Sequence, residues 1–225
     1  MNNQSSNHLF MIEPEVFYSN EQTLDSNHYQ VEHDNQLKKN DIKEKALTEF
    51  NNLKNQIEAH GIKVTSMKGT PECPDHIFPN WFITFEDKTF QLFSMKAENR
   101  RLEKTKEMIE FLSLHYSLNG DLTEYEDKGQ FLEATSSMVF DRVNRVVYAA
   151  ISPRTNADLT KKWCIDNNYE LVMFETVVIK EIQFIILTYS CMLGSKLLVF
   201  ALMLSSLNIE KWLEIKYLDI MMSMK

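Results

Sequence analysis

Cysteine, proline and glycine are scarce in this chain of 225 residues, which contains 3 Cys, 5 Pro and 5 Gly. Cys73, Cys164 and Cys191 show no CxxC spacing and cannot all pair with one another, which favours a reducing compartment such as the cytoplasm. The first residues, MNNQSSNH, lack a basic segment followed by an apolar one. We therefore expect no secretory signal.

Positive charge is also in deficit, because 24 Lys and Arg face 32 Asp and Glu and give a net charge of −8. This balance argues against general binding to nucleic acid or to anionic lipid. It does not exclude a small cationic ligand, because the local field in a cleft matters more than the total charge. With 44% apolar and 25% charged residues, the chain has a globular composition and can form one medium domain or two small ones.

The last part of the chain, residues 179–225, differs from residues 1–178. It has no Pro or Arg, five of the twelve Met and a net charge of +1. Residues 182–207 are nearly all apolar, which is long enough for a membrane span, although Lys196 near the middle would be costly there. A buried hydrophobic hairpin broken at Gly194-Ser195 is the alternative. A tail-anchored membrane protein therefore ranks last among the predictions.

Hydrophobic periodicity predicts recurring elements. Helices are expected at 37–59, 98–116 and 156–167, hairpins at 81–93 and 137–151, and further strands at 62–67 and 169–174. The hairpins and helices recur about every 60 residues, which is typical of blades around an axis or of an α/β repeat. An ordinary α+β sandwich with similar element lengths explains the spacing equally well.

Polar and charged residues lie where the predicted strands meet turns or helix starts. Three regions carry them: Asp75 to Phe82, Asn99-Arg100-Arg101, and Leu132 to Arg142 together with Ser152 to Asn156. Side chains at such positions can converge on one pocket. Cys73 and His76 lack a second pair of metal ligands, so we expect no metal site.

These segments, taken in order, resemble the arginine deiminase and amidinotransferase superfamily, in particular its bacterial branch of amidinotransferases or citrulline-utilisation hydrolases. The resemblance covers residues 9–176. It implies a guanidino-group hydrolase or amidinotransferase, without metal or organic cofactor, that acts on arginine or a related guanidine. It also implies an α/β fold, a five-bladed propeller of ββαβ units, of which this chain has room for about three blades. Homo-oligomer formation is left open.

The resemblance also implies roles for individual residues. In the superfamily a cysteine thiolate attacks the guanidinium carbon while a histidine supplies protons. Glu133 matches the acidic residue that pairs with this histidine, and Asp75 and Asn80 match residues that hold the substrate. Either Arg100 or Arg101, together with Arg154, matches the arginines that bind a substrate carboxylate. Where the family has glycines after the glutamate, this chain has Ala134 and Ser136.

The histidine and the nucleophilic cysteine of the family have no counterpart in the sequence. No histidine follows His115, and Cys191 lacks a glycine-rich context. The hypothesis that follows is a partial propeller domain at 9–178 and a frameshifted tail at 179–225, without turnover. A catalytically dead protein that binds guanidines or another partner is the alternative.

Overall fold

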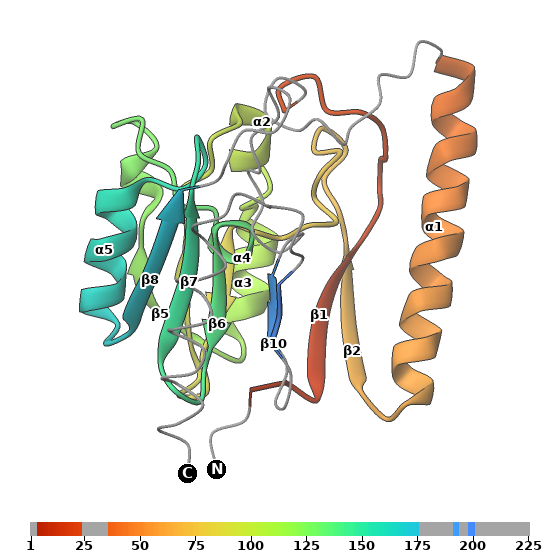
Figure 1. Ribbon diagram of the computed structural model, residues 1–225. Coiled ribbons are helices and arrows are strands. Elements are labelled where there is room, and N and C mark those ends of the chain that lie inside the picture. Colours follow the sequence, from red (N-terminus) through yellow and green to blue (C-terminus); the bar gives the residue numbers. More distant parts are fainter. Residues whose placement is uncertain (1–3, 24–35, 176–190, 194–197, 201–225) are drawn as a thin grey trace.

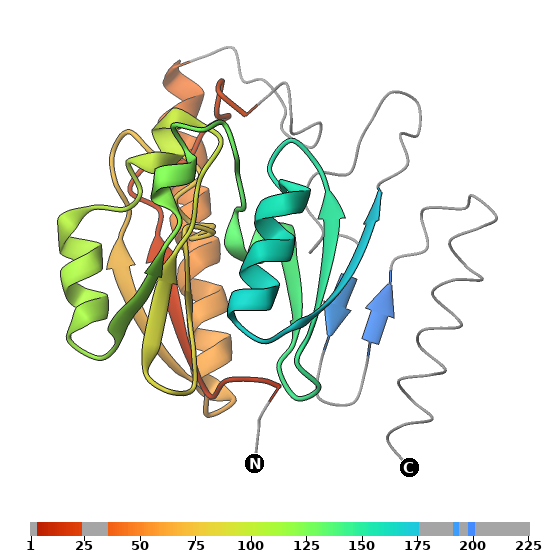
Figure 2. The ribbon, with the colours of Figure 1, turned by 90° about the vertical axis from the view of Figure 1, so that its left-hand side faces the viewer.

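The computed structural model describes residues 4–23, 36–175, 191–193 and 198–200. These residues form a mixed α/β fold, which agrees with the predicted fold class. Figure 1 shows the strands between helix α1 (Gln36–Ala59) on one side and helix α5 (Ala157–Asp166) on the other. In Figure 2, α5 lies in front of the strands and α1 lies behind them. Helices predicted over 37–59 and 156–167 are therefore confirmed.

Two parts of the chain repeat the same order of elements. Each part begins with an antiparallel hairpin, which is followed by helical structure. A third strand then pairs in parallel with the second strand of the hairpin. The first part contains β3 (Phe82–Thr84), β4 (Thr89–Leu92), α2 (Glu98–Arg101), α3 (Lys106–Ser113) and β5 (Ser117–Asp121). The second contains α4 (Ala134–Ser137), β6 (Met138–Asp141), β7 (Val146–Ile151), α5 and β8 (Glu170–Glu175). Both predicted hairpins are confirmed, and each part is one ββαβ unit with a three-stranded sheet.

The N-terminal part contributes a parallel pair of strands joined through α1. Strand β1 (His8–Glu13) pairs with β2 (Lys63–Lys68) in continuous register, from His8 beside Lys63 to Glu13 beside Lys68. A helix is the usual connection between parallel strands, because the chain must return to the starting end of the sheet. The strand predicted over 62–67 is confirmed.

The single helix predicted over 98–116 is wrong in its middle. The structure has two helices, and α3 begins anew after Thr105, whose Oγ1 accepts a hydrogen bond from the Met108 N–H at 3.2 Å. Threonine favours this N-cap position because it satisfies an amide that has no partner within the helix. Leu102 lies in the break between the two helices, and its side chain is 57% exposed.

Most of the predicted hydrophobic tail lies outside the described residues. Strands β9 (Cys191–Leu193) and β10 (Leu198–Phe200), which are described, pair in an antiparallel arrangement. A continuous membrane helix over 182–207 is therefore wrong for these six residues. In the described part of the chain, no helix has the length and apolar character needed to cross a bilayer.

The core lies between the two three-stranded sheets and on both faces of the second one. On β7, Val147 and Ala149 face α5 and the first unit, while Val146, Tyr148 and Ala150 belong to a cluster on the other face. Burial of both faces is typical of sheets that are covered on each side. A further cluster packs the N-terminal strands against β3, β4 and α3 through large apolar side chains, including Ile12, Trp81, Phe90 and Met108.

Candidate functional site

The residues predicted from the sequence as candidate site residues lie at one end of the two hairpins. Asp75 and Asn80 precede β3, and Arg100 follows β4. Glu133 precedes β6, and Arg154 follows β7. Because the strands of each hairpin are antiparallel, the start of the first strand and the end of the second lie side by side. The loops that carry these residues in both units therefore lie at the same end of the strands.

Glu133 is the centre of a buried ion cluster. Its side chain is fully buried, and its Oε2 lies 3.4 Å from Arg154 Nη1 and 3.7 Å from Arg100 Nη1. Oε1 accepts a hydrogen bond from the Lys96 N–H at 3.1 Å, and Ser136 Oγ lies 3.3 Å from Oε2. The structure thus brings together charged side chains from both units.

The turn after Glu133 is strained at Ala134. Its φ is +34°, in a region that glycine adopts more readily than residues with a Cβ. The resemblance to the superfamily predicts glycine in this turn. The positive φ of Ala134 explains why the family prefers glycine here. The hydroxyl of Ser136 also donates a hydrogen bond to the backbone carbonyl of Glu133 at 2.8 Å, within the same turn.

Arg100 is held by a second carboxylate, Glu103, which the sequence analysis missed. Arg100 Nε donates to Glu103 Oε1 at 2.8 Å and Nη2 donates to Oε2 at 3.2 Å, a two-pronged pair with both side chains buried. Burial disfavours the charged form of Arg100, but Glu103 and Glu133 outweigh burial and raise its pKa. Burial also raises the pKa of Glu103 to about 7, although Arg100 opposes this shift.

Asp75 is anchored by residues from the N-terminal loop. Its Oδ2 accepts hydrogen bonds from Asn20 Nδ2 at 2.8 Å and from Thr23 Oγ1 at 3.3 Å. Asn99 Nδ2 in turn donates to Asn20 Oδ1 at 2.7 Å, which connects this loop to the start of α2. The Asp75 carboxylate also acts electrostatically on both Arg100 and Glu103.

Asn80 and Arg101 make contacts with different parts of the structure. Asn80 Oδ1 accepts a hydrogen bond from Thr135 Oγ1 at 3.0 Å, so Asn80 adjoins the turn after Glu133. The guanidinium of Arg101 instead donates to the carbonyls of Met95 and Lys96 at 3.0 and 3.3 Å. Of the two adjacent arginines, the structure brings Arg100 to Glu133 and directs Arg101 to the backbone before α2.

The cysteines with described side chains are poorly suited to nucleophilic attack. Cys73 and Cys164 are both buried, and burial raises the pKa of each thiol to about 12. A thiol becomes a nucleophile only as the thiolate, so both are inert at neutral pH. Among the described residues, no group of three or more His, Cys, Asp or Glu side chains could hold a metal ion.

The charge balance of the cluster suits a cation. Three carboxylates, from Asp75, Glu103 and Glu133, face two guanidinium groups, from Arg100 and Arg154. Burial, reinforced by Arg100, lowers the pKa of the nearby His76 to about 4, so this histidine adds no positive charge at pH 7. With Glu103 ionised, one negative charge is in excess, and either a proton on Glu103 or a bound cation can neutralise it.

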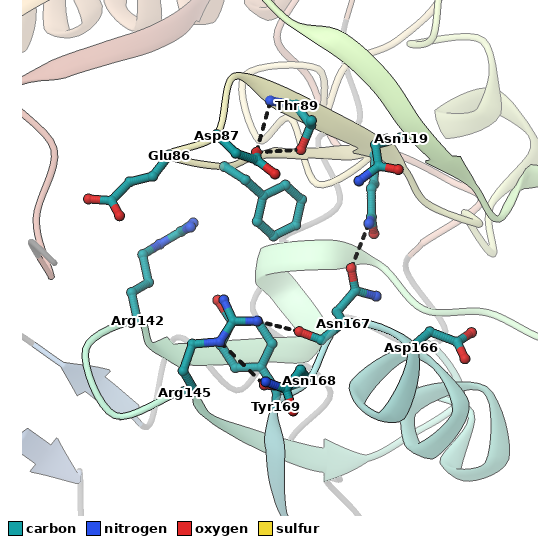
Figure 3. A pocket seen from close by; sticks show the side chains of 12 residues that line it. Glu86, Asp87, Thr89, Asn119, Arg142, Arg145, Asp166, Asn167, Asn168 and Tyr169 are labelled. Carbon is teal, nitrogen blue, oxygen red and sulfur yellow. Dashed lines mark hydrogen bonds between the residues drawn. The ribbon is translucent and has the colours of Figure 1, made fainter.

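A polar cavity of about 450 Å³ lies at the opposite end of the strands (Figure 3). It contains groups of both charges, including Glu86, Arg142 and Arg145. Figure 3 shows Arg145 beside Tyr169, and its guanidinium carbon lies 3.9 Å from the ring centroid while its nitrogens donate to the carbonyls of Asn167 and Asn168. These contacts join the β6–β7 turn to the start of β8, and we interpret them as structural.

The model of a family described as N,N dimethylarginine dimethylhydrolase, eukaryotic, matches residues 13–212. None of the curated proteins matches the sequence.

Several solved structures resemble the fold. A dimethylarginine dimethylaminohydrolase in an adduct with S-methyl-L-thiocitrulline has a TM-score of 0.57 at 15% identity, over 85% of this chain and 66% of that chain. The N-terminal domain of ArgZ, a cyanobacterial arginine dihydrolase bound to substrate, has a TM-score of 0.63 at 17% identity, over 86% and 66%. A dimethylarginine dimethylaminohydrolase from Pseudomonas aeruginosa complexed with citrulline has a TM-score of 0.53 at 17% identity, over 76% and 62%. This chain thus spans no more than 66% of the length of each.

Proposed function

The chain belongs to the N,N dimethylarginine dimethylhydrolase family, within the superfamily of guanidino-group-modifying enzymes, and from this membership we propose that its buried cluster binds a guanidinium compound of the arginine type. The observation that carries the proposal is the convergence of Arg100 from the first unit with Glu133 and Arg154 from the second. Carboxylates and arginines in one site fit a ligand that has both a guanidinium and a carboxylate.

The roles that we propose follow the charges. Asp75 and Asn80 hold the guanidinium, and Arg154 binds the ligand carboxylate. Arg100 is better placed than Arg101 to assist Arg154, because it already lies 3.7 Å from Glu133. Glu133 would orient a catalytic histidine in a relative that has one.

The same proposal extends to the architecture. The two ββαβ units and the N-terminal strands would be consecutive parts of a five-bladed propeller, with the cluster near its axis. The identical strand order of both units and the burial of both faces of the β6–β8 sheet support this interpretation. We keep 9–178 as the propeller part and 179–225 as a separate, frameshifted tail.

We expect binding of guanidines without turnover. No histidine follows His115 in the sequence, and Cys73 and Cys164 are held as thiols. Titration calorimetry with arginine, its N-methylated forms and its decarboxylated form should show binding of at least one of them. Assays for citrulline and urea should stay at background.

Asp75→Asn tests the site directly. Removing the carboxylate should weaken guanidine binding by at least about tenfold, because a charge-assisted contact is worth roughly 1.5–3 kcal/mol. Glu86→Gln, at the exposed hairpin turn on the other end of β3, is the matched control and should bind normally. Equal affinity of both variants would overturn the site, whereas citrulline formation would overturn only its inactivity.

The affinity for a guanidine should rise with pH and level off above about 7. Below the raised pKa of Glu103, a proton neutralises the excess charge of the cluster and competes with the guanidinium. The affinity should therefore fall by up to about tenfold per pH unit as the pH drops below 7. Calorimetry from pH 5.5 to 8.5 measures this.

Citrulline is the matched control for the pH series, because its ureido group is neutral. Its affinity should change little over the same range. A guanidine affinity that is equal at pH 6 and pH 8 would contradict the competition.

A further inference from the structure

The N-terminal strands and the first ββαβ unit line an open cavity of about 600 Å³, away from the ion cluster. Its wall includes residues from the starts of β1 and β2, which lie toward the bottom of Figure 1, and residues from the end of α3. Its volume falls within the range typical of small-molecule sites. The ion cluster lies at the other end of the strands, so this cavity is independent of the proposed guanidine site.

The side chains that give the cavity its charge are all basic. Lys63, Lys88, His8 and His115 line it, and no carboxylate does. In the part of the chain that the structure describes, none of the four forms an ion pair. Burial, followed by Lys63, His115 and Lys88, lowers the pKa of His8. In a chain with a net charge of −8, this is a concentrated positive field.

The remaining wall is mostly apolar and aromatic. The rings of Phe10 and Phe111 stack at 5.6 Å, and Phe82 meets Phe10 edge to face at 5.8 Å. Leu114, at 74% exposure, leaves further apolar surface open at the end of α3. Such a wall favours a flat apolar body, and the basic groups favour an anion on its edge.

We propose that this cavity binds a small organic anion with an aromatic body. The rings of Phe10, Phe82 and Phe111 receive the apolar part. Lys63 and Lys88 attract the acidic group, which is a carboxylate, a sulfonate or a phosphate, and the imidazoles of His8 and His115 offer ring nitrogens for hydrogen bonds to it.

A matched pair of fluorescent probes tests the proposal on the full chain. 8-Anilinonaphthalene-1-sulfonate carries an anionic group on an aromatic body, and N-phenyl-1-naphthylamine has the same body without the charge. The sulfonate should bind at one site per chain, and its affinity should fall as NaCl rises from 50 to 500 mM. The neutral probe should bind more weakly and without salt dependence.

Charge reversal locates the site. Lys63→Glu should weaken sulfonate binding by about three- to tenfold, because reversal replaces the attraction of an exposed charge pair by repulsion. Lys106→Glu makes the same change in α3 at a residue outside the cavity wall and should bind as the unaltered chain does. Circular dichroism checks that both variants are folded.

Three results would overturn the assignment. One is equal binding of both probes, and another is equal loss in both variants. The third is binding at several equivalent sites, which would mean adsorption of the dye to apolar surface only.

Discussion

Arg100→Met is expected to lower the free energy of unfolding by about 3–5 kcal/mol. The Arg100 guanidinium forms a two-pronged pair with Glu103 and lies 3.7 Å from Glu133, and all three side chains are buried. Methionine fills a similar volume but leaves two carboxylates short of positive charge in a region closed to water. Urea unfolding followed by circular dichroism, with linear extrapolation to water, measures the change.

The pH dependence of this loss follows from the sign of the shift in Glu103. Its pKa in the folded protein is already raised to about 7, and removal of Arg100 raises it further because Arg100 opposes the effect of burial. A raised folded pKa gives stability that is present at low pH and is lost as the pH increases. The destabilisation by Arg100→Met should therefore be larger at pH 8 than at pH 5.

Two variants control this experiment. Arg101→Met removes the neighbouring arginine, which is partly exposed and donates to backbone carbonyls, so its cost should be nearer 1 kcal/mol. Arg100→Met combined with Glu103→Met replaces both members of the pair and should be more stable than Arg100→Met alone. Equal stability of the Arg100 and Arg101 variants would show that the pair has no special weight.

The sequence predicted the elements whose apolar spacing is regular. The hairpin strands alternate between core and exterior or have both faces buried, and α5 begins after Asn156, whose Oδ1 accepts from the Leu159 N–H at 2.9 Å. The break between α2 and α3 was missed because the apolar spacing of Leu102, Ile109 and Leu112 fits one continuous helix. The N-cap at Thr105 decided against it.

The sequence predicted where the candidate site residues lie, but it did not predict which side chains pair with one another. Their positions at strand ends predicted that Asp75, Arg100, Glu133 and Arg154 lie at one end of the fold. In the structure, the Glu133 carboxylate lies within 3.7 Å of the guanidinium groups of Arg100 and Arg154. Glu103 was missed because an acidic residue three positions after an arginine is usually an exposed helix pair. Burial of both side chains, which depends on how the units pack, cannot be deduced from that spacing.

Trp163→Ala is expected to cost about 3–5 kcal/mol, comparable to the Arg100 variant. The indole lies among Phe93 of the first unit and Phe140 and Tyr169 of the second, with ring centroids 5.7–5.9 Å away. Its Nε1 also donates to Gln91 Oε1 at 2.7 Å, and Gln91 Nε2 donates to Asn167. Alanine would leave a large cavity between the two sheets and an unsatisfied amide. Urea unfolding by circular dichroism measures the loss.

Ile165→Ala on the same helix is the control, because Ile165 is 77% exposed and its loss should stay within about 0.5 kcal/mol. A similar small loss for Trp163→Ala would mean that the two units do not depend on this contact. The expected difference has a consequence for the site, since Arg100 belongs to one unit while Glu133 and Arg154 belong to the other. The contact between Trp163 and Phe93 joins these units, and it therefore holds the two halves of the ion cluster in register.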